Sequence, residues 1–356
     1  MHIVNAMFSR GKGGIEQAFL DYCRALAFLG NQVTAVIHPQ AAICEALYEI
    51  PGIRIQTISN HGQWDVLAVL RLRLLLRALS PDAVIVHGNR AATLLRKAAR
   101  GMCPVVGVTH NYSLGRLLKL NALFALTGDL KHHALKADFP ATKIYEVPNM
   151  LSGVILSVSE ESPAAGDTPP LAQDDTPVIG AMGRFVKKKG FDDWLRALAE
   201  LQSRNIAFKA VLGGSGEEET NLKQLAEELH LTNKVHFSGW VEDKTSFFAS
   251  VDIFCLPSLH EPFGIVLLEA MASGIPAITT ATEGPSEIAT DRINALLVPK
   301  NNPAAMADAL ATLLRDKPLA NQLAQGGIET IRARYTMEKV SATIQESLVE
   351  IVKHHG

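Results

Sequence analysis

The sequence predicts an α/β protein built from two doubly wound, Rossmann-like domains that face a cleft. Three observations support this prediction. Short β-branched runs alternate with segments of helical periodicity along most of the 356 residues, as in a parallel sheet covered by helices on both faces. The chain is too long for one ordinary hydrophobic core. A polar, Pro-rich stretch at 159–177 interrupts the alternation, so we expect one domain on each side of it.

In the first half, we place strands at short apolar runs and helices where apolar residues recur every three or four positions. The predicted strands occupy residues 3–4, 33–37, 53–58, 83–87, 105–110, 123–127 and 144–147. The predicted helices occupy residues 15–29, 41–48, 65–79, 90–100 and 130–136. Ligands of such parallel sheets bind at the carboxyl ends of the strands.

The alternation resumes after the polar stretch. The second group of predicted strands occupies residues 178–182, 207–212, 235–237, 252–256, 277–280 and 295–298. Helices are predicted at 191–202, 217–229 and 243–250, at a segment that begins near Gly264, and in two or three segments after Asn302. We therefore expect an N-terminal domain at 1–150, a linker or surface excursion at 151–176 and a C-terminal domain at 177–335.

The composition is that of an ordinary soluble globular protein, with 47% hydrophobic and 20% charged residues. An uninterrupted apolar run of about 18 residues is missing, so we expect no membrane-spanning helix. The stretch from Met1 to Asn5 enters strand-like sequence directly and lacks the plan of a signal peptide. Four scattered cysteines without metal-binding spacing favour a reducing, cytoplasmic setting.

The net charge of −2 conceals an asymmetry between the two halves. Residues 1–150 contain 16 Lys and Arg against nine Asp and Glu, whereas residues 151–356 contain 18 against 27. Much of the basic excess lies between His61 and Lys136. A basic half indicates an anionic surface or an anionic acceptor, and the alternative is a solvated basic face without a partner.

The stretch from His260 to Pro276 is the most unusual part of the sequence. It follows an apolar run that reads as a buried strand, and its helical periodicity begins near Gly264. Glu261 falls in the loop and Glu269 falls inside an otherwise apolar helix, where an acid is rare unless it is paired or binds a ligand. The first amides of the helix can bind an anion such as a diphosphate. The alternative is a capped core helix with solvated glutamates.

In each half of the chain, one glycine-containing turn follows the first predicted strand. In the first half, Gly13 and Gly14 allow close approach of a ligand to the backbone before a helix; a bare tight turn is the alternative. In the second half, Arg184 and Lys189 lie in a turn whose charges suit a diphosphate, and the alternative is a solvated basic loop. The glycines at 213–216 end another strand and permit close approach, but they form only a weak motif.

His110 is predicted at the carboxyl end of a strand, facing the cleft. A lone histidine is more often a structural hydrogen-bonding group than a catalytic one, so both interpretations stay open at this point. The adjacent pairs His132-His133 and His354-His355 do not face one ligand on a helix, and the spacing around His260 lacks the second histidine of a zinc protease motif. We expect no metal site.

Taken together, these stretches resemble the family 4 glycosyltransferases, which are retaining enzymes of the GT-B fold. The resemblance spans nearly the whole chain, and the sequence departs from the family pattern at Met150, Glu283 and Ala295. The matching residues are Gly13-Gly14-x-Glu16, His110, Lys143-Ile144, Pro148-Asn149, Gly183-Arg184, Lys189-Gly190, Phe237-x-Gly239, Pro257-Ser258, Glu261, Glu269 and Gly274-x-Pro276.

The resemblance implies a role for each candidate residue. The C-terminal domain would bind a nucleotide diphosphate sugar, with Glu269 on the ribose hydroxyls and Glu261 on the hydroxyls of the sugar. His110 would lie near the transferred sugar. In the same family, residues at the places of Arg184 and Lys189 hold the diphosphate, and Gly13 and Gly14 would approach it from the other domain. The backbone amides of Phe263, Gly264, Ile265 and Val266 would touch the sugar and the phosphates. These groups would do the work of a metal ion, so neither a metal nor another cofactor is expected. The final helix, 336–356, would pack toward the N-terminal domain.

The resemblance therefore implies a cytoplasmic, retaining glycosyltransferase of the hexosyltransferase type. The basic N-terminal domain would bind a glycan or glycolipid acceptor, for example in lipopolysaccharide or other cell-envelope polysaccharide synthesis, with a possible peripheral contact to an anionic membrane and no nucleic acid partner. Three alternatives stay open: a soluble transferase that makes a small-molecule glycoside, a non-catalytic nucleotide-sugar-binding protein, and a GT-B relative such as an epimerase or phosphorylase. The identities of the base, the sugar and the acceptor do not follow from the sequence.

Overall fold

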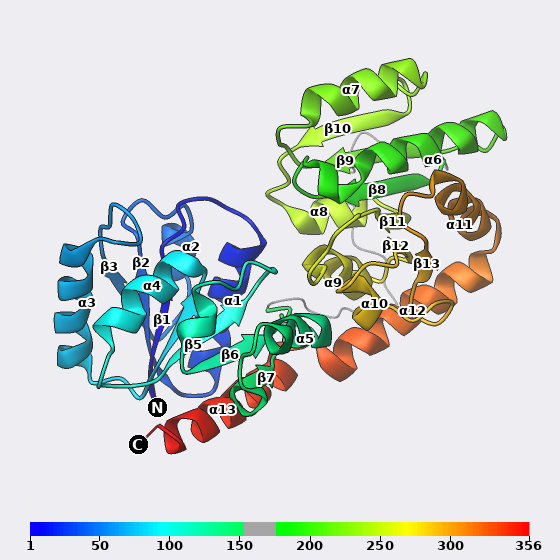
Figure 1. Ribbon diagram of the computed structural model, residues 1–356. Coiled ribbons are helices and arrows are strands. Elements are labelled where there is room, and N and C mark those ends of the chain that lie inside the picture. The colour runs from blue at the N-terminus through cyan, green and yellow to red at the C-terminus, as the bar shows by residue number, and fades with distance from the viewer. Residues whose placement is uncertain (153–175, 356) are drawn as a thin grey trace. The chain divides into compact units, whose positions relative to one another are not determined.

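The structure is a computed structural model that describes residues 1–152 and 176–355 (Figure 1). Contacts divide the chain into two compact units: the N-terminal unit is Met1–Ser152 with Arg334–Gly356, and the C-terminal unit is Gly153–Ala333. The predicted linker at 151–176 lies outside the described residues except at its ends. At one end, Leu151 forms a parallel bridge with Thr336, within the N-terminal unit.

The N-terminal unit contains a parallel sheet. Its strands are β1 (His2–Met7), β2 (Gln32–Ile37), β3 (Ile53–Thr57), β4 (Ala83–His87), β5 (Val105–Thr109), β6 (Ala122–Ala125) and β7 (Ile144–Glu146). They are arranged in the order β3-β2-β1-β4-β5-β6-β7. The register aligns Met7 at the end of β1 with His87 at the end of β4. From β1 the next strands, β2 and β3, are added on one side, whereas β4 to β7 are added on the other side. The boundary between β1 and β4 is therefore the topological switch point, where such folds bind ligands.

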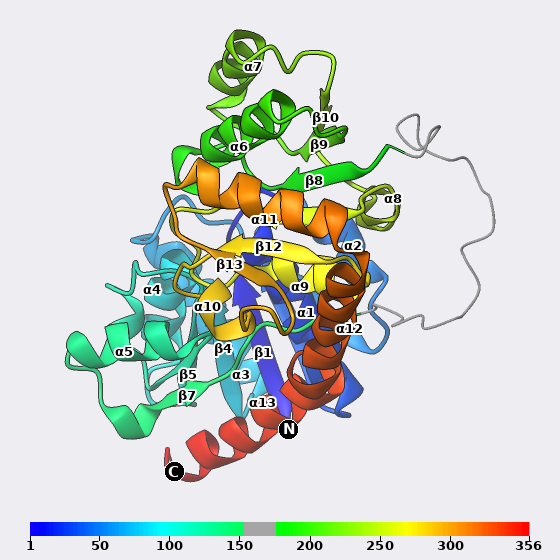
Figure 2. The same cartoon turned by 90° about the vertical axis from the view of Figure 1, so that its right-hand side faces the viewer.

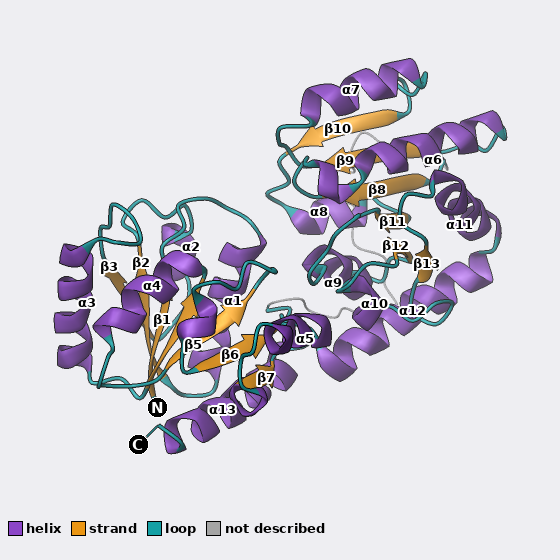
Figure 3. Cartoon of the chain, viewed as in Figure 1, coloured by secondary structure: helices purple, strands orange, loops and turns teal. Residues whose placement is uncertain are grey.

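Helices cover both faces of this sheet (Figure 3). They are α1 (Gly14–Phe28), α2 (Cys44–Tyr48), α3 (Val66–Leu79), α4 (Asn89–Ala98) and α5 (Gly128–Lys136). Side chains of a strand alternate between faces, and those of β1 show which helix covers which face. Val4 belongs to the core cluster that contains Leu72 of α3 and Leu94 of α4, whereas Met7 belongs to the cluster that contains Phe19 of α1.

The C-terminal unit repeats this plan with a second parallel sheet. Its strands are β8 (Val178–Met182), β9 (Lys209–Gly213), β10 (Val235–Gly239), β11 (Ile253–Leu256), β12 (Ala277–Thr280) and β13 (Leu296–Val298). They are arranged in the order β10-β9-β8-β11-β12-β13. The switch point of this sheet therefore lies between β8 and β11.

The helices of the C-terminal unit are α6 (Phe191–Ser203), α7 (Glu219–Glu228), α8 (Lys244–Ala249), α9 (Ile265–Ala272), α10 (Pro285–Ile288), α11 (Pro303–Arg315) and most of α12 (Lys317–Arg334). Figure 2 shows α6 and α11 side by side. On β11, Ile253 and Cys255 face the core cluster that contains Trp194 of α6, whereas Phe254 meets Phe248 of α8 at 5.6 Å between ring centroids. Helices α6 and α8 therefore cover opposite faces of this sheet.

The last helix, α13 (Met337–Lys353), belongs to the N-terminal unit. It contacts α1, and the side-chain amide of Asn31 donates to Oε1 of Gln345 at 2.9 Å. The end of the chain is thus anchored to the unit in which the chain begins. Among the described residues, no helix is both long and apolar enough to cross a membrane.

The predicted α/β class with two doubly wound sheets is confirmed. Some predicted boundaries differ from the observed ones by one or two residues. In the two examples that follow, the residue at the predicted boundary is the N-cap of a helix and not part of the predicted strand or helix. Thr127, predicted as the end of a strand, accepts from the amide of Leu130 and starts α5. Asp243, predicted inside a helix, accepts from the amide of Ser246 and starts α8. The short helix α10 was not predicted.

Gly190 is a position where the fold itself requires glycine. Its φ is +63°, and a Cβ atom there would lie 2.1 Å from the carbonyl oxygen of Pro257. Gly190→Ala is therefore expected to lower the free energy of unfolding by about 2 kcal/mol or more, measured by urea denaturation. Gly115→Ala is the matched control, because a Cβ at Gly115 meets no atom within 4 Å. Equal stabilities of the two variants would contradict this packing argument.

Candidate functional site

The candidate residues of the C-terminal unit follow the two strands at its switch point. The turn after β8 contains Arg184 and the 3-10 turn Lys187–Lys189, and the loop after β11 runs from Pro257 to Gly264. Two backbone bonds join these segments, because the amides of Leu259 and His260 donate to the carbonyl of Lys188 at 2.8 and 3.2 Å. The close approach at Gly190 makes this junction possible.

The junction places Lys189 against Glu261. The Lys189 ammonium forms an ion pair with Oε2 of Glu261, and Ser258 donates a hydrogen bond to the same oxygen at 3.3 Å. The two charged side chains are only 18% and 12% exposed. In the absence of a ligand each neutralises the other, which lowers the free-energy cost of holding charges in a site of low polarity. An incoming anion would compete with Glu261 for Lys189.

Glu269 lies on α9 with its carboxylate almost removed from solvent. Lys244 at the start of α8 donates to Oε1 at 2.5 Å, but Oε2 is buried and has no hydrogen-bond partner among the residues that the structure describes. Burial raises the pKa of this carboxyl, and Lys244 opposes that effect. A buried acceptor for which the described residues supply no donor is energetically costly, which sets Glu269 apart from the paired Glu261.

The start of α9 provides donors on the same loop. Gly264 is the N-cap residue and adopts φ +101°, a left-handed conformation that favours glycine. Helix geometry leaves the amides of Ile265 and Val266 without intrahelical acceptors, at the positive end of the helix dipole. The backbone of Phe263, just before Gly264, packs closely against Gly284. A Cβ atom at Gly284 would lie 2.4–2.5 Å from the Phe263 backbone, so this contact requires glycine.

Arg184 does not join the Lys189–Glu261 pair. Its side chain is exposed and makes no hydrogen bond or ion pair within the described parts of the chain. Packing within the unit explains two of the glycines at 213–216. A Cβ atom at Gly214 would lie 1.9 Å from the carbonyl oxygen of Gly183, and a Cβ atom at Gly216 would lie 2.4 Å from the carbonyl oxygen of Phe185. These glycines therefore allow close packing against the backbone of Gly183 and Phe185, the two neighbours of Arg184.

In the N-terminal unit, His110 follows the last residue of β5 and is joined to a buried chain of hydrogen bonds. Its Nε2 is 2.9 Å from Nδ1 of His87, and Nε2 of His87 is 3.0 Å from Oδ1 of Asn5. The Asn5 amide nitrogen donates to the carbonyl oxygen of Phe19 at 3.2 Å. This last bond fixes the orientation of the Asn5 amide, because a carbonyl can only accept.

The chain then fixes both histidine tautomers. Oδ1 of Asn5 accepts, so His87 carries its proton on Nε2 and accepts at Nδ1. His110 must therefore donate from Nε2, which leaves its Nδ1 as an acceptor. Burial lowers the pKa of His87 well below its ordinary value, and burial lowers the pKa of His110 to about 4. Both rings are neutral at pH 7, and His110 offers a hydrogen-bond acceptor rather than a positive charge.

These two histidines predict an acid-sensitive stability. Their folded pKa values lie below the unfolded value of about 6.5, so the unfolded chain takes up protons that the folded chain refuses as the pH falls. The free energy of unfolding should therefore decrease between about pH 6.5 and pH 4. Urea denaturation at pH 7, 6 and 5 should show a smaller decrease in His110→Gln than in the wild type, while exposed His355→Gln keeps the wild-type decrease. Equal decreases in all three proteins would refute neutral buried histidines.

Gly14 is the first residue of α1, next to the switch point of the N-terminal sheet. A Cβ at Gly14 would meet no atom within 4 Å, and its φ does not require glycine. The N-cap residue Gly13 has φ 168°, an extended conformation open to any residue. In contrast to Gly190, neither the φ of Gly13 and Gly14 nor the space around Gly14 requires glycine, and the predicted approach of a ligand to this backbone stays a prediction.

Sequence reasoning missed three polar residues of the site. His87 and Asn5 position His110, and Lys244 pairs with Glu269. His87 ends a strand that the sequence does predict, next to the strand that ends before His110, and this shared edge is a signal that could have been used. Lys244 has no comparable signal, because its partner is 25 positions away on another helix. Within the described residues, no group of three His, Cys, Asp or Glu side chains could hold a metal ion.

Two parallel sheets, each with polar and glycine-rich loops at its switch point, define a two-unit Rossmann-like α/β protein. The family profile described as "Glycosyltransferase Family 4" matches residues 12–151, and the profile described as "Glycosyl transferases group 1" matches residues 167–330. Together these two matches extend over most of the described chain. The chain therefore belongs to the GT-B glycosyltransferases of family 4, and its activity is that of a glycosyltransferase.

Individual relatives support this assignment along the whole chain. The lipopolysaccharide core biosynthesis glycosyltransferases LpsE and LpsD of Rhizobium meliloti are 30% and 29% identical, over 94% and 93% of this chain and 95% and 93% of theirs. Among solved structures, HepE of Anabaena in complex with UDP-glucose superposes with a TM-score of 0.85 at 21% identity, covering 98% of this chain and 100% of that chain. At this identity the superposition demonstrates a common fold.

Proposed function

We propose that this glycosyltransferase moves a hexose, with retention of anomeric configuration, from a nucleotide diphosphate sugar to a lipid-linked glycan of the cell envelope. The observation that carries the donor proposal is the buried Oε2 of Glu269, an acceptor for which the described residues supply no donor. Glu269 lies on α9, the helix whose first amides lack intrahelical acceptors. A ribose hydroxyl would supply the missing hydrogen bond. HepE, whose structure contains UDP-glucose, supports the same class of donor.

The remaining groups would act on the diphosphate and the sugar. When the donor binds, its diphosphate would replace Glu261 as the partner of Lys189, and Arg184 would close on the same anion. The released Glu261 carboxylate would then accept hydrogen bonds from sugar hydroxyls. The bond between the anomeric carbon and the diphosphate oxygen breaks, and a bond forms between the acceptor oxygen and the anomeric carbon. The proton of the acceptor hydroxyl passes to the departing nucleotide phosphate or to solvent.

Charge stabilisation in this proposal comes from the protein. Arg184, Lys189 and the amides of Ile265 and Val266 would stabilise the negative charge that grows on the departing diphosphate, as preorganised donors do in other enzymes. Gly13 and Gly14 would approach the same diphosphate. We therefore propose metal-independent transfer. His110 would accept a hydrogen bond from the transferred sugar at Nδ1, the atom that its tautomer leaves free.

The acceptor proposal rests on two observations. The relatives LpsE and LpsD are named for lipopolysaccharide core biosynthesis, and a lipopolysaccharide is a lipid-anchored, anionic glycan. The N-terminal half of this chain carries the basic excess that such an acceptor requires. We propose that the enzyme acts at the cytoplasmic face of a membrane and binds its acceptor through the N-terminal unit.

A thermal-shift screen tests the donor proposal. Sugars linked to UDP, GDP, ADP and dTDP are compared at equal concentration, and the correct donor should raise the melting temperature by mass action. The donor that does so is then tested for transfer to a lipopolysaccharide core acceptor, with product configuration read by NMR. A failure of every donor to shift the melting temperature, or an inverted product, would contradict the proposal.

Glu269→Gln isolates the contribution of the buried acceptor. Loss of a charged hydrogen bond should weaken binding of the nucleoside diphosphate by about 10- to 100-fold, measured by calorimetry. The ligand-free variant should have nearly the stability of the wild type, because removal of the buried charge offsets the loss of the ion pair with the more exposed Lys244. Glu228→Gln, an exposed position on α7 of the same unit, is the control. Unchanged affinity in Glu269→Gln would show that Glu269 has no ligand role.

A further inference from the structure

The helix α3 exposes an apolar face that the protein does not cover. Four of its side chains are more than half exposed: Val66 at 67%, Leu67 at 65%, Leu70 at 52% and Leu74 at 65%. Their spacing places them on one side of the helix. The opposite side, with Ala68, Leu72 and Leu76, is buried in the core of the sheet. A helix that is apolar on both its buried and its outer side is unusual in a protein surrounded only by water.

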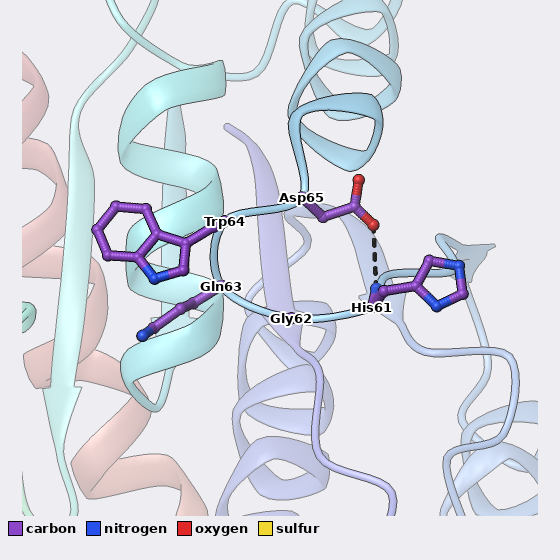
Figure 4. Close-up of a pocket in the computed structure, with 5 residues that line it drawn as sticks. All are labelled: His61, Gly62, Gln63, Trp64 and Asp65. Atoms are coloured by element: carbon purple, nitrogen blue, oxygen red, sulfur yellow. Dashed lines mark hydrogen bonds between the residues drawn. The ribbon is translucent and has the colours of Figure 1, made fainter.

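A further large apolar side chain, Trp64, lies in the loop just before the helix. It is 60% exposed and belongs to the loop His61–Asp65, which lines an open hollow of about 380 Å³ (Figure 4). Asp65 accepts from the amides of His61 and Ala68 at 3.0 and 2.9 Å, which fixes the loop and caps the helix. Figure 4 shows the carboxylate directed to one side of the loop and the Trp64 ring to the other.

Positive charge surrounds the apolar face. Arg71 and Arg77 are exposed on α3, and α4, which packs against it, ends in exposed Arg96 and Lys97. Lys97 Nζ and the guanidinium carbon of Arg116 lie 4.9 and 5.0 Å from the centroid of the Trp64 ring. The sequence contains no Asp or Glu from residue 66 to 81, nor from 83 to 128. This surface is therefore apolar in its centre and basic at its margin; its own acid is Asp65, whose carboxylate accepts from the amides of His61 and Ala68.

We propose that this surface, defined as Trp64, Val66, Leu67, Leu70 and Leu74 with their flanking basic residues, inserts into an anionic phospholipid membrane. Interfacial helices bury a stripe of leucine and tryptophan at the boundary between headgroups and acyl chains, while Lys and Arg pair with the phosphates. Each basic residue near an anionic surface adds to the attraction. Insertion would bring the carboxyl edge of the N-terminal sheet to a membrane-embedded acceptor; for that consequence the inference rests on the proposed function.

Vesicle flotation tests the inference directly. The wild type should bind vesicles of equal parts phosphatidylglycerol and phosphatidylcholine, and binding should fall at least about 10-fold in pure phosphatidylcholine or at 0.5 M salt, because both remove the attraction between charges. Leu70→Ser/Leu74→Ser should bind at least about 10-fold more weakly. The control Ile293→Ser/Val349→Ser changes side chains that are 59% and 51% exposed elsewhere in the chain, and it should bind like the wild type.

Three outcomes would overturn the inference: no vesicle binding by the wild type, equal binding by the wild type and Leu70→Ser/Leu74→Ser, or a dimer by light scattering that the double variant alone dissociates. The last result would assign the face to self-association. The donor-induced melting shift, measured on the same variant without vesicles, should be unchanged. Failure of that shift in the wild type would count against the proposed donor, whereas normal shift with no vesicle binding would count only against the membrane surface.

Discussion

Replacing Lys189 with Met is expected to reduce kcat by about 100- to 1,000-fold, because a donor aimed at developing negative charge contributes on this scale. Arg184→Met should have an effect of similar size. The 3-10 turn Lys187–Lys189 supplies its own controls, because Lys187 and Lys188 are exposed neighbours whose side chains do not enter the ion pair with Glu261. Single-turnover transfer is the measurement.

Lys187→Met and Lys188→Met should retain transfer within about threefold of the wild type, since surface charges contribute little. If all four variants lose activity equally, the effect would reflect the net charge of the turn and not a positioned group. If Lys189→Met keeps wild-type transfer, the diphosphate is bound elsewhere. Lys189→Met should also lower the melting temperature, because it leaves the Glu261 carboxylate buried without its partner.

Glu261→Gln is expected to reduce kcat/KM for the donor by about 100-fold or more, because a site built to accept hydrogen bonds from hydroxyls discriminates strongly once that acceptor is weakened. Its affinity for the nucleoside diphosphate alone should be unchanged or higher, because Lys189 is no longer held by a competing carboxylate. This separation of sugar from nucleotide distinguishes Glu261 from Glu269, whose replacement should weaken the nucleotide itself. Product inhibition and donor kinetics on the same variant provide both numbers.

A parallel loss of donor kinetics and nucleotide affinity in Glu261→Gln would contradict the division of roles. It would indicate that the Lys189–Glu261 pair only holds the loop in place. In that case the double variant Lys189→Met/Glu261→Gln should be more stable than either single variant, and a double-mutant cycle of unfolding free energies decides between the two explanations.

The alternation of strands and helices was readable from the sequence because parallel sheets bury both faces, so each strand is a short apolar run between periodic helices. The register of Met7 with His87 was not readable, since strands that are distant in the sequence become neighbours only through packing. The boundaries failed where a cap residue such as Thr127 or Asp243 looks like its neighbours in composition.

For the candidate site, too, the sequence predicted which residues belong to it but not the contacts between them. Glu261, Glu269, Arg184 and Lys189 were identifiable because each lies in a motif that resembles a known family. The ion pair between Lys189 and Glu261 was not, because it depends on a close backbone approach at Gly190. The histidine tautomers depend on the orientation of one buried amide, that of Asn5, and no sequence pattern encodes such an orientation.

The outer face of α3 shows a different limit. Its residues fit the helical pattern that predicted the element, but periodicity alone could not say which apolar stripe faces the core. Ala68, Leu72 and Leu76 occupy the core, and Leu70 and Leu74 are left outside. The composition predicted the basic half, whereas the structure was needed to show that the basic residues border exposed leucines.

Hydrogen exchange with and without the nucleoside diphosphate tests the location of the donor site most directly. The amides of Ile265 and Val266 lack intrahelical acceptors and should exchange rapidly in the free protein. We predict that a saturating nucleoside diphosphate slows exchange in peptides that cover Phe263–Glu269 and Gly183–Lys189, and that Glu228→Gln keeps this protection while Glu269→Gln weakens it. Saturating nucleotide that leaves exchange in both segments unchanged would contradict the account.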